Sequence, residues 1–97
     1  MIDDNRIKLI AEHYGFDRQC DKLIEEMSEL LVAITHMKKK DENCADHYSN
    51  FIEELGDVLI IAEQLKILLP HHDRTALDES ISFKLNREIE RMENNRN

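Results

Sequence analysis

The 97-residue chain contains only two glycines and one proline, and this scarcity is the feature that most limits its fold. An all-β chain needs many turns, and turns depend on these residues. Apolar residues instead recur at every third or fourth position over long stretches, which is the spacing of a stripe buried on one face of a helix. We therefore predict an all-α fold, with residues 1–97 forming one domain.

Four helices are predicted, at approximately residues 3–14, 17–39, 45–69 and 75–93. Asp3 or Asp4 is expected to cap the first helix, and Asp17 the second. Pro70 is expected to end the third helix and to open a loop, after which Thr75 caps the fourth. Four helices with short joints predict a four-helix bundle, which in so short a chain a second copy would help to complete.

The formal net charge of −8 argues against two classes of main partner. Nucleic acids and anionic membrane surfaces both repel an acidic protein, so neither is expected. No apolar run approaches the roughly 20 residues that cross a bilayer, and the N-terminus is acidic where a signal peptide is basic. Cys20 and Cys44 show no CxxC spacing and are expected to be reduced thiols. A cytoplasmic protein is expected.

Four carboxylates lie within or beside the apolar stripes of the second and third helices. At about 100° per residue, Glu54 and Asp57 fall inside the apolar arc of the third helix, on either side of the direction of Ile61. Glu26 and Glu29 border the stripe of the second helix. Each helix therefore offers the interior two acids, three residues and about 5–6 Å apart.

A buried carboxylate without a partner is costly, and four carboxylates cannot neutralise one another. A divalent cation can neutralise them, and Mg²⁺ is the usual ion where phosphate oxygens complete the coordination shell. The same faces have a second interpretation, an acidic groove that docks lysine or arginine from a partner. A di-iron site is disfavoured, because it requires Glu-x-x-His motifs and the residue three positions after the glutamate is here Glu29 or Asp57, not histidine.

The acids also form a two-part motif that resembles the signature of the MazG-like nucleotide pyrophosphohydrolases, in the all-α NTP pyrophosphatase superfamily. The first part is E-E-x-x-E at residues 25–29, and the second is E-x-x-D at residues 54–57. The resemblance extends over roughly residues 5–92. It implies a four-helix bundle of that type, completed by oligomerisation, in which four acids bind Mg²⁺, with Mn²⁺ as a substitute. These ligands are Glu26, Glu29, Glu54 and Asp57.

The resemblance also implies catalytic roles for other residues. Lys84 and Arg87 match a basic Lys-x-x-Arg motif whose side chains contact phosphate, and Lys22 is a further candidate for this contact. Glu25 or Glu29 is the expected general base, and activation of the water by the metal alone is the alternative. The implied reaction is hydrolysis of a (d)NTP between its α and β phosphates, which gives a (d)NMP and pyrophosphate.

These features predict a Mg²⁺-dependent nucleoside triphosphate pyrophosphatase that serves house-cleaning or nucleotide-pool control and works as a homo-oligomer, either a dimer or a tetramer. The alternative is a non-enzymatic helical interaction module, whose acidic groove binds a basic partner.

Two smaller predictions concern other positions. His13, Tyr14 and Phe16 either stack on a nucleobase or pack in the core. Gly56 lies in mid-helix, where glycine costs roughly 1 kcal/mol against alanine, and therefore predicts a close helix contact.

Overall fold

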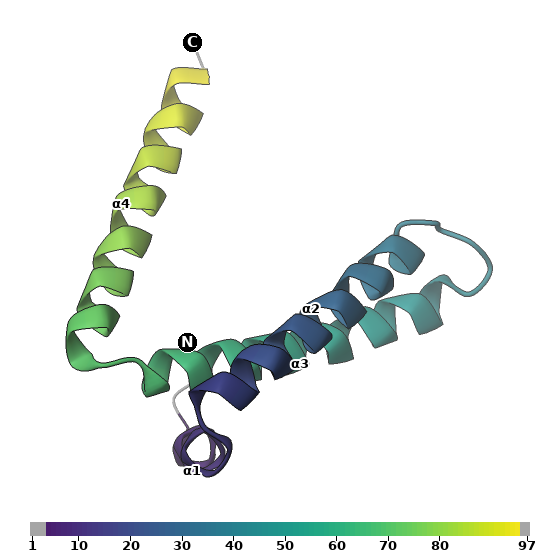
Figure 1. The fold of residues 1–97 in the computed structure, drawn as a ribbon. Coiled ribbons are helices and arrows are strands. Elements are labelled where there is room, and N and C mark those ends of the chain that lie inside the picture. The colour runs from purple at the N-terminus through teal and green to yellow at the C-terminus, as the bar shows by residue number, and fades with distance from the viewer. Residues whose placement is uncertain (1–3, 96–97) are drawn as a thin grey trace.

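The computed structural model describes residues 4–95 and contains four helices, as predicted. They are α1 (Asn5–Tyr14), α2 (Phe16–Met37), α3 (Cys44–Leu68) and α4 (His71–Asn95). α2 and α3 lie side by side and antiparallel, α1 crosses them near the start of α2, and α4 leads away from the end of α3 (Figure 1). The all-α prediction is confirmed. Asp3, one of the two expected caps, and the tail residues 96–97 lie outside the described residues.

The joint between α1 and α2 consists of a single residue, Gly15. Its φ of 85° lies in the left-handed region, which favours glycine, and its N–H donates to the carbonyl of Ala11 at 2.9 Å. At the other end of α1, the side chain of Asp4 accepts from the N–H of Arg6 at 2.9 Å, as expected of a cap. The predicted cap at Asp17 is wrong, because α2 already begins at Phe16 and Asp17 lies in its first turn.

The joint between α3 and α4 is also shorter than predicted. α4 begins at His71, four positions before the expected cap at Thr75. The carbonyl of Pro70 accepts from the N–H of Arg74 at 3.0 Å, so the proline starts the next helix as well as ending the last. This is allowed because the first turn of a helix does not need the N–H that proline lacks. The hydroxyl of Thr75 donates back to the carbonyl of His71 at 3.2 Å and caps nothing.

The core formed by α1, α2 and α3 is small. Its buried apolar residues are Ile7, Ala11, Ala33 and Ile61. No residue of α4 is buried within the described part of the chain, and an ion pair of 3.2 Å between Lys66 and Asp78 lies at its joint with α3. Residues 4–95 of one chain therefore do not form a closed four-helix bundle.

Two further findings concern surfaces of the helices. No side chain or other helix lies within 4 Å of where a Cβ on Gly56 would be, so the predicted contact at this glycine is not made within the described chain. Among residues 4–95, no helix combines the length and the apolar character that a membrane span requires.

Candidate metal centre

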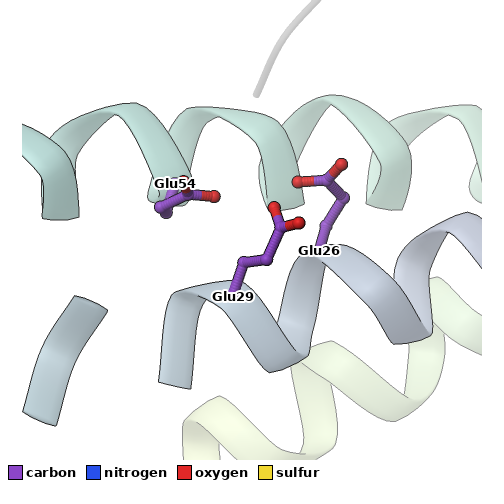
Figure 2. A group of neighbouring side chains, drawn as sticks. All are labelled: Glu26, Glu29 and Glu54. Atoms are coloured by element: carbon purple, nitrogen blue, oxygen red, sulfur yellow. The ribbon is translucent and has the colours of Figure 1, made fainter. Parts of the chain in front are cut away.

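Three of the predicted acids converge between α2 and α3. Glu26 and Glu29 extend from successive turns of α2, and Glu54 extends from α3 toward them (Figure 2). One carboxylate oxygen from each residue lies within 4.8 Å of the other two. The antiparallel packing of the two helices thus joins the two halves of the sequence motif, which 24 residues separate along the chain.

Two carboxylate oxygens of this cluster are buried without a hydrogen-bond partner. Glu26 is only 7% exposed, and its Oε2 has no partner among the described residues. The Oε2 of Glu54, from the facing helix, is in the same state. Leaving a buried acceptor unsatisfied is unfavourable, and more so for a charged group. These two oxygens therefore mark a position where a cation would be stabilising.

Lys22 supplies part of that charge. Its Nζ lies 3.2 Å from Oε1 of Glu26 and 3.7 Å from Oε2 of Glu25. The hydrogen bond to Glu26, followed by the charges of Glu25 and Glu26, raises the pKa of Lys22. One exposed lysine cannot neutralise the whole cluster, since Glu29 and Glu54 form no ion pair with it.

The negative charge that Lys22 does not neutralise affects the pKa of Glu29. The negative charge of Glu26 raises the pKa of Glu29 above its ordinary value, with smaller contributions from burial and from Glu54. Like charges that raise a neighbour's pKa also oppose the folded state in which they meet. A bound cation would reverse this repulsion.

Asp57, the fourth predicted ligand, is not part of this cluster. It is exposed and lies one turn after Glu54 on α3, where no helix of the described chain covers it. Asp57 nevertheless lies near the site. It is followed on the same face of α3, three and four residues later, by Ile60 and Ile61, which line a neighbouring cleft. Glu25 is exposed at the edge of the same cleft and pairs with Lys22.

Lys84 and Arg87 are not brought to the acids within one chain. Both are exposed on α4, which contacts α3 near their joint through the ion pair of Lys66 with Asp78 and then leads away from the cluster (Figure 1). The guanidinium of Arg87 lies 5.8 Å from the centre of the Phe83 ring, one turn away on its own helix.

A cleft of about 590 Å³ opens beside the cluster, between α1, α2 and α3. Its lining includes Glu25 and also Lys22, which pairs with Glu26, so the cleft adjoins the acidic site. It also contains a buried pair that our sequence analysis missed, in which Nε2 of Gln19 donates to Oε1 of Gln64. The sequence contained a signal that Gln19 is buried. On the helical wheel of α2 it lies within about 20° of Glu26, on the buried side.

The donor set favours a hard divalent cation. All the convergent atoms are carboxylate oxygens, the ligand type that Mg²⁺, Ca²⁺ and Mn²⁺ prefer, and no sulfur or imidazole is among them. Comparison of the chain with profiles of known protein families, with curated proteins and with solved structures finds no match.

Proposed function

We propose that this chain is a Mg²⁺-dependent nucleoside triphosphate pyrophosphohydrolase of the MazG-like type, which converts (d)NTP and water to (d)NMP and pyrophosphate. The observation that carries the proposal is the buried, unpartnered oxygen of Glu26 facing that of Glu54, with Glu29 beside them. Substrate and site are both anionic, so a cation between them is required for binding. The E-E-x-x-E and E-x-x-D motifs support the reaction class through their resemblance to that family.

Each residue of the site then has a role set by its position. Glu26, Glu29 and Glu54 would hold the metal, which would neutralise the triphosphate and polarise its oxygens. Water attacks the α-phosphorus as the bond to the α–β bridging oxygen breaks, and pyrophosphate leaves. Glu25 or Glu29 accepts the proton of the attacking water, because both are exposed at the edge of the cluster.

Lys22 changes partner in this scheme. With a cation held at Glu26, the ammonium of Lys22, which lies 3.2 Å from that carboxylate, would be free to contact a phosphate oxygen. Lys22 both lines the cleft and pairs with Glu26, so it adjoins the acids and any group bound in the cleft. This supports the phosphate-binding role expected of Lys22 from the resemblance.

We also propose that the working form is a homo-oligomer, because one chain leaves too much surface exposed. A folded monomer of 11.5 kDa exposes about 5,800 Å², whereas this chain exposes 7838 Å². The excess, about 2,000 Å², is larger than the roughly 800 Å² per partner of a stable interface. The radius of gyration of 16.8 Å likewise exceeds the value of about 12.5 Å expected for a compact chain of this length.

The surface that a second copy would cover is the flank of α2 and α3 opposite Glu29. It forms an apolar groove of about 680 Å³, in which Ser28 is the one polar residue. We call this the apolar face. Its apolar residues are Leu23, Ile24, Met27, Leu30, Leu31, Ile34, Val58 and Ala62. A face without charge fits a second copy of the same face, since two chains of net charge −8 repel each other elsewhere.

Oligomerisation also gives α4 a role. The helix projects from its own chain with every residue from Asp78 to Asn95 exposed, and it carries Lys84 and Arg87 (Figure 1). We propose that these two cations serve the acidic site of another copy, where they stabilise the leaving pyrophosphate.

The proposal is tested by metal binding and by product analysis together. Mn²⁺ is expected to raise the thermal stability of the wild-type protein, by about 2.7 kcal/mol at a concentration a hundredfold above its Kd. The variant Glu54→Gln should lose this effect and lose pyrophosphate release from a panel of NTPs. The matched control is Glu53→Gln, because Glu53 is exposed and outside the cluster. Release of orthophosphate alone, or activity retained in Glu54→Gln, would contradict the proposal.

The alternative function is an acidic groove that docks a basic partner helix. One observation favours this alternative. The ion pair between Lys22 and Glu26 shows that the cluster accepts an ammonium group. A metal that leaves the stability of the wild-type protein unchanged, while a lysine-rich helical peptide raises it and fails to do so in Glu54→Gln, would establish this function instead.

A further inference from the structure

The cleft beside the acids has a composition that the metal site does not explain. Its walls include the exposed side chains of Ile10, Tyr14 and Ile60, and at its base lie Gln19 and Gln64. Ligand sites typically combine apolar walls with a few polar groups that fix orientation, in volumes of about 300–1,000 Å³. The volume of about 590 Å³ falls in this range.

The two glutamines are buried more deeply than is usual for this residue type. Gln19 is 4% exposed and Gln64 is 1% exposed, and one hydrogen bond joins their amides. An amide carries one acceptor oxygen and one donor nitrogen, so each residue keeps one further group. Among residues 4–95, neither Oε1 of Gln19 nor Nε2 of Gln64 has a hydrogen-bond partner, and both residues line the cleft.

The pair therefore presents one acceptor and one donor to a cleft whose lining combines apolar side chains with charged ones. Exchanging the oxygen and nitrogen of both amides reverses the order of the two groups but leaves one of each. The matching ligand is a flat group that carries a donor and an acceptor on one edge. The Watson–Crick edges of nucleobases have this arrangement.

The path from this pair to the acids is also suited to a nucleotide. Lys22 lines the cleft and lies 3.2 Å from Glu26 of the metal cluster. A base held at Gln19 and Gln64 would direct its sugar and phosphates past Lys22 toward the acids. Tyr14 offers an aromatic ring in the same cleft, with the guanidinium of Arg18 at 4.9 Å from the ring centre.

We infer that the Gln19–Gln64 pair binds the hydrogen-bonding edge of a nucleobase and determines which base this cleft accepts. The inference rests on the proposed function for the orientation of the ligand, but the binding of the base requires no metal. It can therefore fail or succeed independently of the hydrolytic reaction.

The first experiment measures binding of uridine, cytidine, adenosine and guanosine to the full chain in EDTA by calorimetry, with ribose as the base-free control. At least one nucleoside should bind at least tenfold more tightly than ribose, and the four should differ from one another. Equal binding of ribose and all nucleosides, or no binding of any, would overturn the inference. Hydrolysis of NTPs with a KM independent of the base would leave the proposed function standing and overturn this inference.

The second experiment replaces both glutamines, as Gln19→Met/Gln64→Met. Removing both partners of a buried hydrogen bond and retaining their shape is close to neutral for stability, so the variant is expected to fold. It should lose at least tenfold in affinity for the preferred nucleoside and keep the Mn²⁺-induced rise in melting temperature. Unchanged nucleoside affinity in the double variant would overturn the inference.

A second variant, Gln64→Glu, replaces the double variant if that protein loses its helical circular dichroism. The introduced carboxylate still accepts from Gln19 but presents an acceptor in place of the amide donor. The nucleoside preference of this variant should change, and an unchanged preference would overturn the inference.

Discussion

The ammonium of Lys22 lies 3.2 Å from one oxygen of the Glu26 carboxylate, while the other oxygen of the same carboxylate is buried without a partner. The carboxylate is thus half satisfied, by a cation from its own helix. This pairing offsets part of the negative charge of the cluster and leaves the second oxygen of Glu26 without a partner among residues 4–95. Under the proposed function, this pairing would allow the chain to fold before a cation binds.

Glu29→Gln is expected to have opposite effects with and without metal. In EDTA the variant should melt at a higher temperature than wild type, because the charge of Glu26 raises the pKa of Glu29 and opposes its ionised form. With Mn²⁺ the variant should gain less stability than wild type, since a ligand is lost. Differential scanning fluorimetry in both buffers measures this. Glu79→Gln, on the exposed surface of α4, is the control and should match wild type in both.

Leu31→Glu is expected to abolish self-association. Leu31 is 66% exposed in one chain, so the substitution costs little there, but it would place a charge within the apolar face of an oligomer. Light scattering after gel filtration should show wild type at a multiple of 11.5 kDa and the variant near that mass. Leu9→Glu is the control, because Leu9 is 71% exposed but lies on α1. A wild-type monomer, or a variant that still associates, would exclude the apolar face as the interface.

Mixing two inactive variants tests whether α4 serves another copy. Glu54→Ala removes a metal ligand, and Lys84→Ala/Arg87→Ala removes the cations of α4. If α4 crosses between subunits of a dimer, a mixed dimer contains one site with both sets intact, and an equal mixture should recover about a quarter of wild-type activity. Pyrophosphate release before and after co-refolding measures this recovery. A mixture that stays inactive would place the cations at their own chain's site, and a Lys84→Ala/Arg87→Ala variant that is active by itself would place them outside catalysis.

Much of the fold was predictable because helical stripes are local. The spacing of apolar residues gave four helices, and Gly15 and Pro70 lie at two of the joints. The predicted start of α4 was wrong because Thr75 is of a residue type that often caps helices. The carbonyl of Pro70, which no side-chain pattern reveals, makes the first hydrogen bond of the helix instead.

The candidate site was predictable only in part because it depends on contacts between helices. The i, i+3 spacing correctly paired Glu26 with Glu29 within one helix. Which residues of α3 meet them depends on the register between α2 and α3, and that register brings in Glu54 but leaves Asp57 exposed. The direction of α4, and with it the place of Lys84, depends on a two-residue joint that periodicity does not describe.

The two glycines are expected to respond in opposite ways to alanine. Gly56→Ala should stabilise the protein by about 1 kcal/mol, because the residue is helical and a Cβ there meets nothing within 4 Å. Gly15→Ala should destabilise it, because the φ of 85° disfavours any side chain. Urea denaturation of both variants measures the two changes. A destabilising Gly56→Ala would instead reveal the helix contact predicted from the sequence, made by a second copy.

Asp4 is expected to give a pH-dependent contribution at the start of α1. Its hydrogen bonds from Arg6 lower its pKa from 3.8 to about 2. The ionised side chain therefore stabilises the fold above pH 3.8, and this contribution is lost as the pH falls through about 2. Asp4→Asn keeps a good capping residue without the charge. Its melting temperature should lie below that of wild type at pH 5, and the gap should close toward pH 2. A gap that does not change with pH would show that charge is not the cause.

The single-residue joint at Gly15 has a mechanical consequence. No flexible linker separates α1, which bears Tyr14, from α2, which bears Glu26. The carbonyl of Gly15 already accepts from the N–H of Gln19 at 3.1 Å in the first turn of α2. A tilt of α1 therefore turns the start of α2 with it. We therefore expect a ligand that shifts Tyr14 in the cleft to shift Gln19 and the start of α2 as well, because a single hydrogen-bonded residue separates the two helices.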